Sequence, residues 1–317
     1  MSATLRGHLL ALFAVSVWGT TFVSTKLLLQ HLSPVQILFD RFLLAWLVLW
    51  LLHPVWRGWE GWKQELHYAA MGATGVTLYF LTENYALQFT QASNVGLLVS
   101  SAPLLTALLA HFFSTDEGLS RPLVIGSLIA FAGVALVMFN GSVVLQLNPL
   151  GDLLALSAGG MWALYSTLLK RVSKPHGLLH LTRRIFGYGL LTMLPALWLT
   201  GYTAALPTIL LHQVWPQLLF LGLIASALCY VVWNNAVQLI GAVKASNYIY
   251  LIPAITMLTA AIILREQITP LALLGAALIV AGVWFAEHGS PLLRRTSSST
   301  RQAKYQAPYA SDNQIEK

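Results

Sequence analysis

The sequence predicts an all-α membrane protein with ten transmembrane helices, arranged as two inverted five-helix repeats with both termini in the cytoplasm. Three observations support this prediction. The chain of 317 residues is 57% hydrophobic and only 9% charged, whereas an ordinary soluble domain has about 25% charged residues. Apolar runs of roughly the 20 residues that a bilayer requires follow one another with short connectors. The second half of the chain also repeats the first half at a nearly constant spacing.

Apolar runs long enough to cross a bilayer divide the chain into its predicted elements. These runs leave no segment for a soluble catalytic domain. They lie at about 7–29, 34–53, 67–88, 92–112, 122–140, 150–170, 178–199, 215–239, 244–264 and 269–288.

The distribution of Lys and Arg indicates which side of the membrane each connector faces. An even number of spans places both termini on one side, and a cytoplasmic N-terminus gives the inside segments almost all of the basic residues. The segments expected inside contain Arg6, Arg57, Lys63, Arg121, Lys170, Arg171, Lys174, Arg183, Arg184, Lys244, Arg294, Arg295, Arg301, Lys304 and Lys317. The outside connectors contain Arg265 alone, while Lys26 and Arg41 lie within spans. This is the positive-inside pattern, and it accounts for the formal net charge of +7 without a nucleic-acid partner.

The internal repeat pairs residues that lie 150 positions apart, as Asn84 and Asn234 do. Other pairs at this spacing are Gly72 with Gly222, Ala86 with Ala236, Gln88 with Gln238, Pro103 with Pro253 and Thr106 with Thr256. The last spans match at a spacing of 149, through Gly126 with Gly275. We therefore expect a first five-helix repeat at 1–142, a second at 143–288 and a disordered cytoplasmic tail at 289–317.

An odd number of spans in each repeat has a consequence for transport. The second copy must enter the membrane upside down, so a pseudo-two-fold axis in the membrane plane relates the copies. Transporters built in this way bind substrate between the halves near the midplane and alternate access by rocking one half on the other. The repeat therefore predicts a secondary transporter.

Glu83 stands inside the apolar third span, and its counterpart in the second repeat is Trp233. A charged residue at the centre of a span costs about 2.5–3.5 kcal/mol on insertion scales and usually marks a functional site. We expect it either to attract a substrate ammonium group or to bind a proton coupled to transport. The alternative is a carboxyl near the outer membrane boundary, hydrogen-bonded to Asn or Thr neighbours. The asymmetry between the copies favours the substrate or ion role.

Two kinds of residue recur at matched positions in both copies. Asn84 and Asn234 either line the cavity or hydrogen-bond across helices, as amides do in membranes. Pro103 and Pro253 lie in the middle of the fourth and ninth spans. Because a proline inside a helix frees a carbonyl and kinks the helix, we expect these two to act as hinges.

Aromatic and polar side chains supply the rest of the predicted substrate surface. Aromatic rings suit an organic solute and form cation–π contacts with an ammonium group. The candidates are Trp18, Tyr79, Trp162, Tyr165, Tyr230 and Trp233, with Asn94, Ser101 and Tyr248 on the cavity-facing side of the fourth and ninth spans.

The remaining ionisable residues point to structure rather than to chemistry. We expect Asp40, Arg41 and Lys26 to pair locally at the outer rim. His176 and His180 have a metal-ligand spacing, but no acid is adjacent and basic residues surround them. The single cysteine, the lack of a phosphate-binding lysine loop and the lack of a Gly-x-Ser-x-Gly elbow lead us to expect no catalytic residue, no metal and no cofactor.

Several short motifs occur in a specific order along the chain. They are Val17-Trp18-Gly19-Thr20-Thr21-Phe22, Asn84-Tyr85-Ala86-Leu87 leading into Ala92-Ser93, Ala102-Pro103-Leu104, Glu266, and Gly275 followed by Ala281-Gly282-Val283. Over residues 7–288 the chain resembles the EamA family of the drug/metabolite transporter superfamily. It departs from that pattern in the second copy, where Met161-Trp162-Ala163 replaces Trp-Gly and Asn235-Ala236-Val237 replaces the usual Ala-Leu.

The resemblance implies a multi-pass exporter of amino acids or related metabolites in the bacterial inner membrane. It also implies a pocket enclosed mainly by the third, fourth, eighth and ninth spans around the first and sixth. We expect a secondary transporter of small amino acid-like or cationic metabolites, with proton exchange through Glu83 as one hypothesis. The alternatives are an uncoupled facilitator of the same solutes, a non-transport membrane scaffold and a membrane-embedded enzyme, for which the sequence offers no cluster of catalytic groups.

Overall fold

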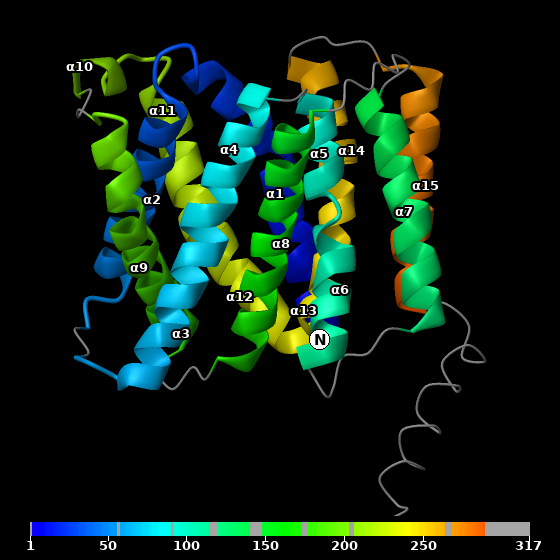
Figure 1. Ribbon diagram of the computed structural model, residues 1–317, viewed down its shortest axis with the longest axis horizontal. Helices are drawn as coiled ribbons and strands as arrows, with labels where there is room; N and C mark the ends of the chain where they lie inside the picture. The colour runs from blue at the N-terminus through cyan, green and yellow to red at the C-terminus, as the bar shows by residue number, and fades with distance from the viewer. Residues whose placement is uncertain are drawn as a thin grey trace, which may run out of the picture.

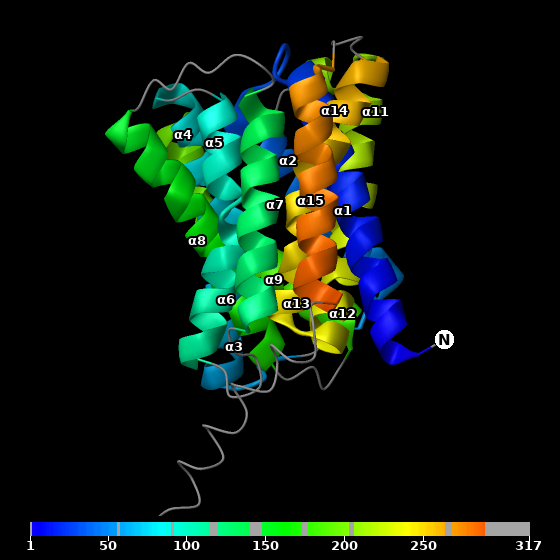
Figure 2. The same ribbon diagram turned by 90° about the vertical axis from the view of Figure 1, so that its right-hand side faces the viewer.

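The described part of the protein is a bundle of helices (Figures 1 and 2). The computed structural model describes residues 2–55, 58–89, 92–113, 120–139, 148–172, 177–202, 206–263 and 268–288, and these ranges contain no strand. The expected tail at 289–317, the boundary between repeats at 142–143, Glu266 and His176 lie outside the described residues, as do the side chains of Lys26 and Asn94.

Six helical segments of the described chain are long and apolar enough to cross a membrane. They are α2 (Pro34–Leu52), Val95–Phe113, Arg121–Met138 in α7 (Arg121–Phe139), Trp215–Ile240, Ala242–Ile263 and α15 (Pro270–His288). Each lies within or close to a predicted span. The all-helical membrane class is therefore confirmed for these segments.

Further long helices occupy the other predicted spans. They are α1 (Ala3–Leu28), α8 (Pro149–Arg171), α9 (Leu178–Leu199), and the continuous run of α3 (Trp62–Gly72), η1 (Ala73–Leu78) and α4 (Tyr79–Phe89). A short helix, α10 (Leu206–Ile209), follows α9.

Local sequence signals fix where several helices begin. Ser33 caps α2 through a reciprocal pair of hydrogen bonds with Gln36, and Pro34 stands at the first helical position. Asn148 caps α8 by accepting a hydrogen bond from the backbone N–H of Gly151, and Pro149 again stands at the first helical position. Both arrangements satisfy amide groups that a helix start leaves free, and proline loses nothing there because its missing N–H would be unpaired.

Wide π-helical turns recur at matched positions in the two copies. The first, η1 (Ala73–Leu78), precedes α4, and the second, η2 (Phe220–Leu228), lies between α11 (Trp215–Leu219) and α12 (Cys229–Ile240). Residues 73–78 correspond to 223–228 at the spacing of the repeat. π-turns are rare and often mark functional sites. The duplicated pair therefore makes this part of the bundle a candidate functional region.

Both matched prolines lie where a span is interrupted. Pro103 stands in the first turn of α6 (Ala102–Phe113), after a turn that separates it from α5 (Ala92–Val99). Pro253 stands in the first turn of α14 (Leu251–Ile263), after α13 (Ala242–Asn247) and the 3-10 turn η3 (Tyr248–Tyr250). Pro103 therefore follows a break between two helices, whereas Pro253 follows a 3-10 turn within a continuous helical run. Both lie in the first turn of an α-helix, where proline is tolerated best.

Close glycine contacts join α7 and α15, the last helix of each copy. A Cβ atom at Gly126 would lie 2.5 Å from the carbonyl oxygen of Gly282, and one at Gly133 would lie 2.6 Å from that of Gly275. Gly126 corresponds to Gly275 and Gly133 to Gly282, so each contact is the repeat image of the other. The partner number falls as the residue number rises, hence the two helices run antiparallel.

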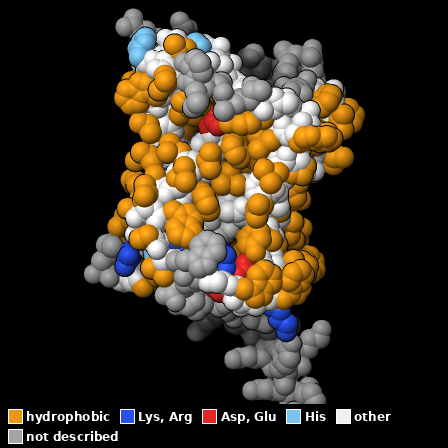
Figure 3. All heavy atoms as spheres, turned by 90° about the vertical axis from the view of Figure 1, so that its left-hand side faces the viewer, with side chains coloured by type: hydrophobic (Ala, Val, Ile, Leu, Met, Phe, Trp, Pro, Cys, Tyr) orange, Lys and Arg blue, Asp and Glu red, His pale blue; other side chains and the backbone are white. Residues whose placement is uncertain are grey.

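The surface of the bundle and the positions of its first and last described helices agree with a membrane location. The first residues of α1 and the last residues of α15 lie at the same end of the bundle, the lower end in Figures 1 and 2. Apolar side chains cover the middle of the face in Figure 3, and the Lys and Arg side chains visible there gather toward the lower end.

Candidate functional site

Five aromatic side chains from both copies meet in the interior, and we call them the aromatic box. Trp18 comes from α1, Tyr79 from α4, Trp162 from α8, and Tyr230 and Trp233 from α12. The ring centroids of Trp18 lie 5.4 Å from Trp162 and 5.2 Å from Trp233, and those of Tyr79 and Trp162 are 5.4 Å apart. The rings are tilted or edge-on, the geometry that aromatic pairs prefer. The box therefore brings together five of the predicted substrate residues.

The π-turns supply backbone acceptors to this box. Trp18 donates from Nε1 to the carbonyl oxygen of Ala225 in η2 over 2.9 Å, and the Tyr230 hydroxyl donates to the carbonyl oxygen of Gly75 in η1 over 2.9 Å. Ala225 and Gly75 are repeat counterparts. Since a π-turn shifts backbone hydrogen bonding from the i+4 to the i+5 residue, it leaves carbonyls available for side chains from other helices.

Two indole groups of the box keep unpaired donors. Trp162 is 6% exposed and Trp233 0% exposed, yet neither Nε1–H has a hydrogen-bond partner among the described residues. A buried donor without a partner costs about 1–3 kcal/mol, and in a native protein such a group calls for an explanation, for example a bound water or ion. These two N–H groups thus mark where an acceptor is expected.

Glu83 lies one turn along α4 from Tyr79. The carboxylate is half-buried, and its Oε1 accepts a hydrogen bond from the Tyr79 hydroxyl over 3.4 Å. This hydrogen bond thus comes from a box tyrosine rather than from the Asn or Thr neighbours that the alternative required.

Arg41 is the functional candidate that sequence reasoning placed elsewhere. Its side chain is 7% exposed, Nε donates to the Ser226 hydroxyl over 3.0 Å, and the guanidinium carbon lies 5.2 Å from the ring centroids of Phe42 and Phe80. Arg41 and Glu83 interact electrostatically, but no ion pair within 4.0 Å joins them in the described chain. The sequence could have identified Arg41 as a functional candidate, because a charged residue within an apolar span usually has a function.

The expected pairing of Asp40 with Arg41 does not occur. Asp40 instead accepts a hydrogen bond from the Tyr202 hydroxyl over 2.8 Å. Successive residues on a helix point about 100° apart, so one meets the bundle interior and the other the segment after α9. Burial, followed by the hydrogen bond to Asp40, raises the pKa of Tyr202 to about 12, so this phenol stays a donor at neutral pH.

The matched amides differ in their surroundings. Asn234 is 0% exposed, and its side chain accepts from the Tyr165 hydroxyl over 2.6 Å and donates to the Thr182 hydroxyl over 2.9 Å. Asn84 is half-buried. The geometry of Asn234 is that of an interhelical connection, whereas Asn84 keeps both of its predicted roles.

Ser101 and Tyr248 lie apart from the aromatic box. The Ser101 hydroxyl donates to the carbonyl oxygen of Leu98 over 2.6 Å and packs against α8 near Gly159. The Tyr248 hydroxyl lies 2.9 Å from Nδ1 of His8 near the start of α1. The structure therefore does not bring these two predicted residues to the box.

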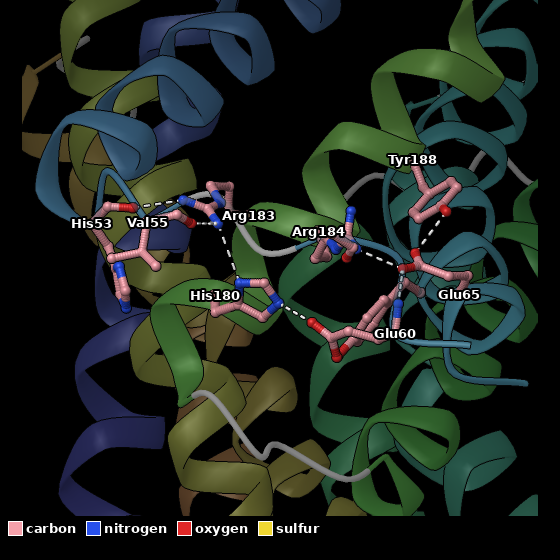
Figure 4. Close-up of polar contacts among 10 residues, drawn as sticks. His53, Val55, Glu60, Glu65, His180, Arg183, Arg184 and Tyr188 are labelled. Atoms are coloured by element: carbon pink, nitrogen blue, oxygen red, sulfur yellow. Dashed lines mark hydrogen bonds and ion pairs between the residues drawn. The ribbon is translucent and has the colours of Figure 1, made fainter. Parts of the chain in front are cut away.

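A polar network at the lower end joins the segment after α2 to α9 (Figure 4). His180 pairs with Glu60, and Arg184 and Tyr188 both contact the Glu65 carboxylate. Arg183 donates to the carbonyl oxygens of residues 53 and 55 over 2.6 and 2.8 Å. His180, which the sequence paired with His176, thus pairs with an acid of the other copy, and no group of metal ligands occurs among the described residues.

Comparison with known proteins agrees with this architecture. A family model described as the EamA-like transporter family matches residues 5–139 and again residues 149–286. A solved crystal structure with 22% sequence identity gives a TM-score of 0.73 over 94% of this chain and 99% of that chain, which shows a shared fold.

Three curated proteins show the range of relatives. An uncharacterized transporter of Archaeoglobus fulgidus is 27% identical over 87% of this chain and 96% of its own length. A probable amino-acid metabolite efflux pump of Salmonella typhimurium is 27% identical over 91% of this chain and 96% of its own length. A probable terminal-alkyne amino-acid exporter of Streptantibioticus cattleyicolor is 29% identical over 73% of this chain and 76% of its own length.

The relatives named by function are transporters and exporters, and the apolar helices suit a membrane location. The family model matches once in each copy and covers most of the chain. This protein therefore belongs to the EamA-like transporter family.

Proposed function

We propose that this transporter exports small amino acid-like or cationic metabolites by alternating access between two inverted five-helix repeats. Ten spans with both ends in the cytoplasm fit the positions of the helices and of the basic residues. The contact of Gly126 with Gly282 and its repeat image, Gly133 with Gly275, support a pseudo-two-fold axis, because in a two-fold contact residue i meets j and j meets i.

The observation that carries this proposal is the composition of the aromatic box. Its rings come from α1 and α4 of the first copy and from α8 and α12 of the second, so a solute there lies between the halves that must move. This differs from the implied pocket mainly in that no box residue comes from the fourth or ninth span. Pro103 and Pro253 lie in the first turns of α6 and α14 and are proposed as hinges for that movement.

Glu83 gives the site its charge. The aromatic rings and the carboxylate together suit an ammonium group, which is attracted by both. A carboxyl in an apolar surrounding is also stabilised in its protonated form, so the same residue can exchange a proton for the solute. Proton-coupled export is therefore the main proposal, and an uncoupled facilitator of the same solutes is its competitor.

Replacement of Glu83 by Gln in reconstituted vesicles tests the proposal. We expect a pH gradient to drive solute flux in the wild type and to have no effect on Glu83→Gln, because the amide cannot take up the proton. Asp152→Asn is the matched control, since it removes a carboxylate at the start of α8, away from the aromatic box. Equal stimulation by the gradient in Glu83→Gln and wild type would refute the coupling and favour the facilitator.

A further inference from the structure

Arg41 carries a charge for which the described residues supply no direct ion pair. Its Nε is bonded to the neutral Ser226 hydroxyl, while no hydrogen bond or ion pair reaches its terminal nitrogens from any described residue. The side chain is 7% exposed, and the guanidinium fork is shaped to hold a carboxylate with two parallel hydrogen bonds.

The other two arginines near the interior show the contrast. Arg184 forms an ion pair with Glu65, and Arg183 uses both terminal nitrogens on backbone carbonyls. Both lie in the network at the lower end of the bundle (Figure 4). Of these three arginines, only Arg41 lies over a ring that contacts the aromatic box, and no described residue bonds its terminal nitrogens.

Arg41 and the aromatic box form one connected set of contacts. The guanidinium lies over Phe80, whose ring centroid is 4.7 Å from that of Tyr79, and over Phe42, whose centroid is 5.7 Å from that of Tyr230. Tyr79 in turn donates to Glu83. A cation and an anion thus both contact this set of rings, and they interact electrostatically without forming a direct ion pair.

We infer that Arg41 binds the carboxylate of a zwitterionic solute and Glu83 its ammonium group, so that the site favours an amino acid over the amine that lacks only the carboxylate. This inference rests on the proposed transport function and narrows its substrate class, because it excludes simple amines as good substrates. The unpaired Nε1–H groups of Trp162 and Trp233 are further donors within the box for carboxylate oxygens. Because both charged groups of an α-amino acid are attached to one carbon, its side chain extends away from them, and the neighbouring rings of the box accept it.

Matched pairs of solutes test the role of the carboxylate. Each pair is an amino acid and the amine that lacks only its carboxylate: leucine with isoamylamine, phenylalanine with phenethylamine, and lysine with cadaverine. Thermal stabilisation of the purified wild type and counterflow into vesicles give relative affinities. We expect at least one amino acid to be transported and to bind about tenfold or more tightly than its amine, the effect of losing a hydrogen-bonded charge pair.

Variants at Arg41 assign that preference to the residue. Arg41→Gln is expected to weaken amino acid binding about tenfold or more and to leave amine binding within about twofold. Arg41→Lys keeps the charge without the fork and should give an intermediate loss, which also serves if the glutamine variant does not fold. Arg121→Gln, at an exposed position at the lower end, is the control and should behave as wild type.

The outcomes separate this inference from the function on which it rests. Amines that bind and move as well as their amino acids in the wild type overturn the inference while export stands. If Arg41→Gln weakens the binding of the amino acid and of its amine equally, the inference is also overturned while export stands. That result would show that Arg41 stabilises the fold and does not bind the carboxylate. A wild type that transports neither member of any pair overturns both.

Discussion

At the scale of single residues, three tryptophans of the aromatic box present the same N–H group in two different situations. Trp18 donates to the carbonyl oxygen of Ala225, whereas Trp162 and Trp233 have no partner for Nε1 among the described residues. The residue type and the apolar spans were readable from the sequence. Which indole is satisfied was not, because Trp18 and Ala225 are 207 positions apart.

This difference predicts that the same substitution has different effects at the two positions. Trp18→Phe should lower the free energy of unfolding by about 0.5–1.5 kcal/mol more than Trp162→Phe, because only the former loses a hydrogen bond. Trp162→Phe should instead weaken amino acid binding. Thermal unfolding in detergent, with and without solute, measures both effects. Equal destabilisation by the two variants would show that the Trp162 donor is not free.

The matched amides give a second comparison within one fold. Asn234→Ala removes two buried hydrogen bonds and should cost about 1–3 kcal/mol of stability, at the upper end for polar contacts between membrane helices. Asn84→Ala is the control at the repeat-equivalent position and should cost less than about 1 kcal/mol. Chemical denaturation in mixed micelles gives both values, and a larger loss for Asn84 would contradict the interhelical role of Asn234.

At the scale of helices, glycine decides which elements approach closely. The spacing of Gly126 and Gly133 was visible in the sequence, together with their counterparts in the second copy. The structure adds that these glycines face one another across α7 and α15. Small residues allow membrane helices to pack closely in the absence of a hydrophobic driving force between them, so this pair fixes how the last helices of the copies meet.

Alanine at two glycines tests that contact. Gly126→Ala places a methyl group 2.5 Å from backbone atoms of α15 and should cost about 1–3 kcal/mol, the usual penalty of overpacking. Gly160→Ala in α8 meets nothing within 4 Å, and alanine's helix propensity should stabilise it by up to about 1 kcal/mol. Comparable melting temperatures for the two variants would show that α7 and α15 do not pack this closely.

At the scale of the whole molecule, the two copies are joined by contacts of different kinds. The glycine contact of α7 and α15 is symmetric, and the aromatic box draws rings from both halves. The network of Glu60, Glu65, His180, Arg183 and Arg184 is confined to the lower end (Figure 4). At the other end the described polar contacts between the copies include the hydrogen bonds of Tyr202 with Asp40 and of Gln213 with His31.

The orientation of the whole molecule in the membrane can be tested by cysteine labelling. Cys229 is the only cysteine of the chain and is fully buried, so an impermeant maleimide should not label the wild type. Ser2→Cys should react only from the cytoplasmic side, and Leu210→Cys, at a position that is 76% exposed, only from the outside. Labelling of both variants from one side would contradict the proposed topology.

The sequence alone determined the membrane class, the duplication and the EamA resemblance, and it predicted a functional role for the lone acid Glu83. These depend on composition, periodicity and spacing, which are properties of the chain in one dimension. Only the tertiary structure decided that Arg41 meets Ser226, 185 positions away, that Asp40 turns to Tyr202, and that Ser101 and Tyr248 lie apart from the aromatic box. Partners of polar groups are set by helix packing, because a buried donor or charge takes whichever acceptor the neighbouring helix presents.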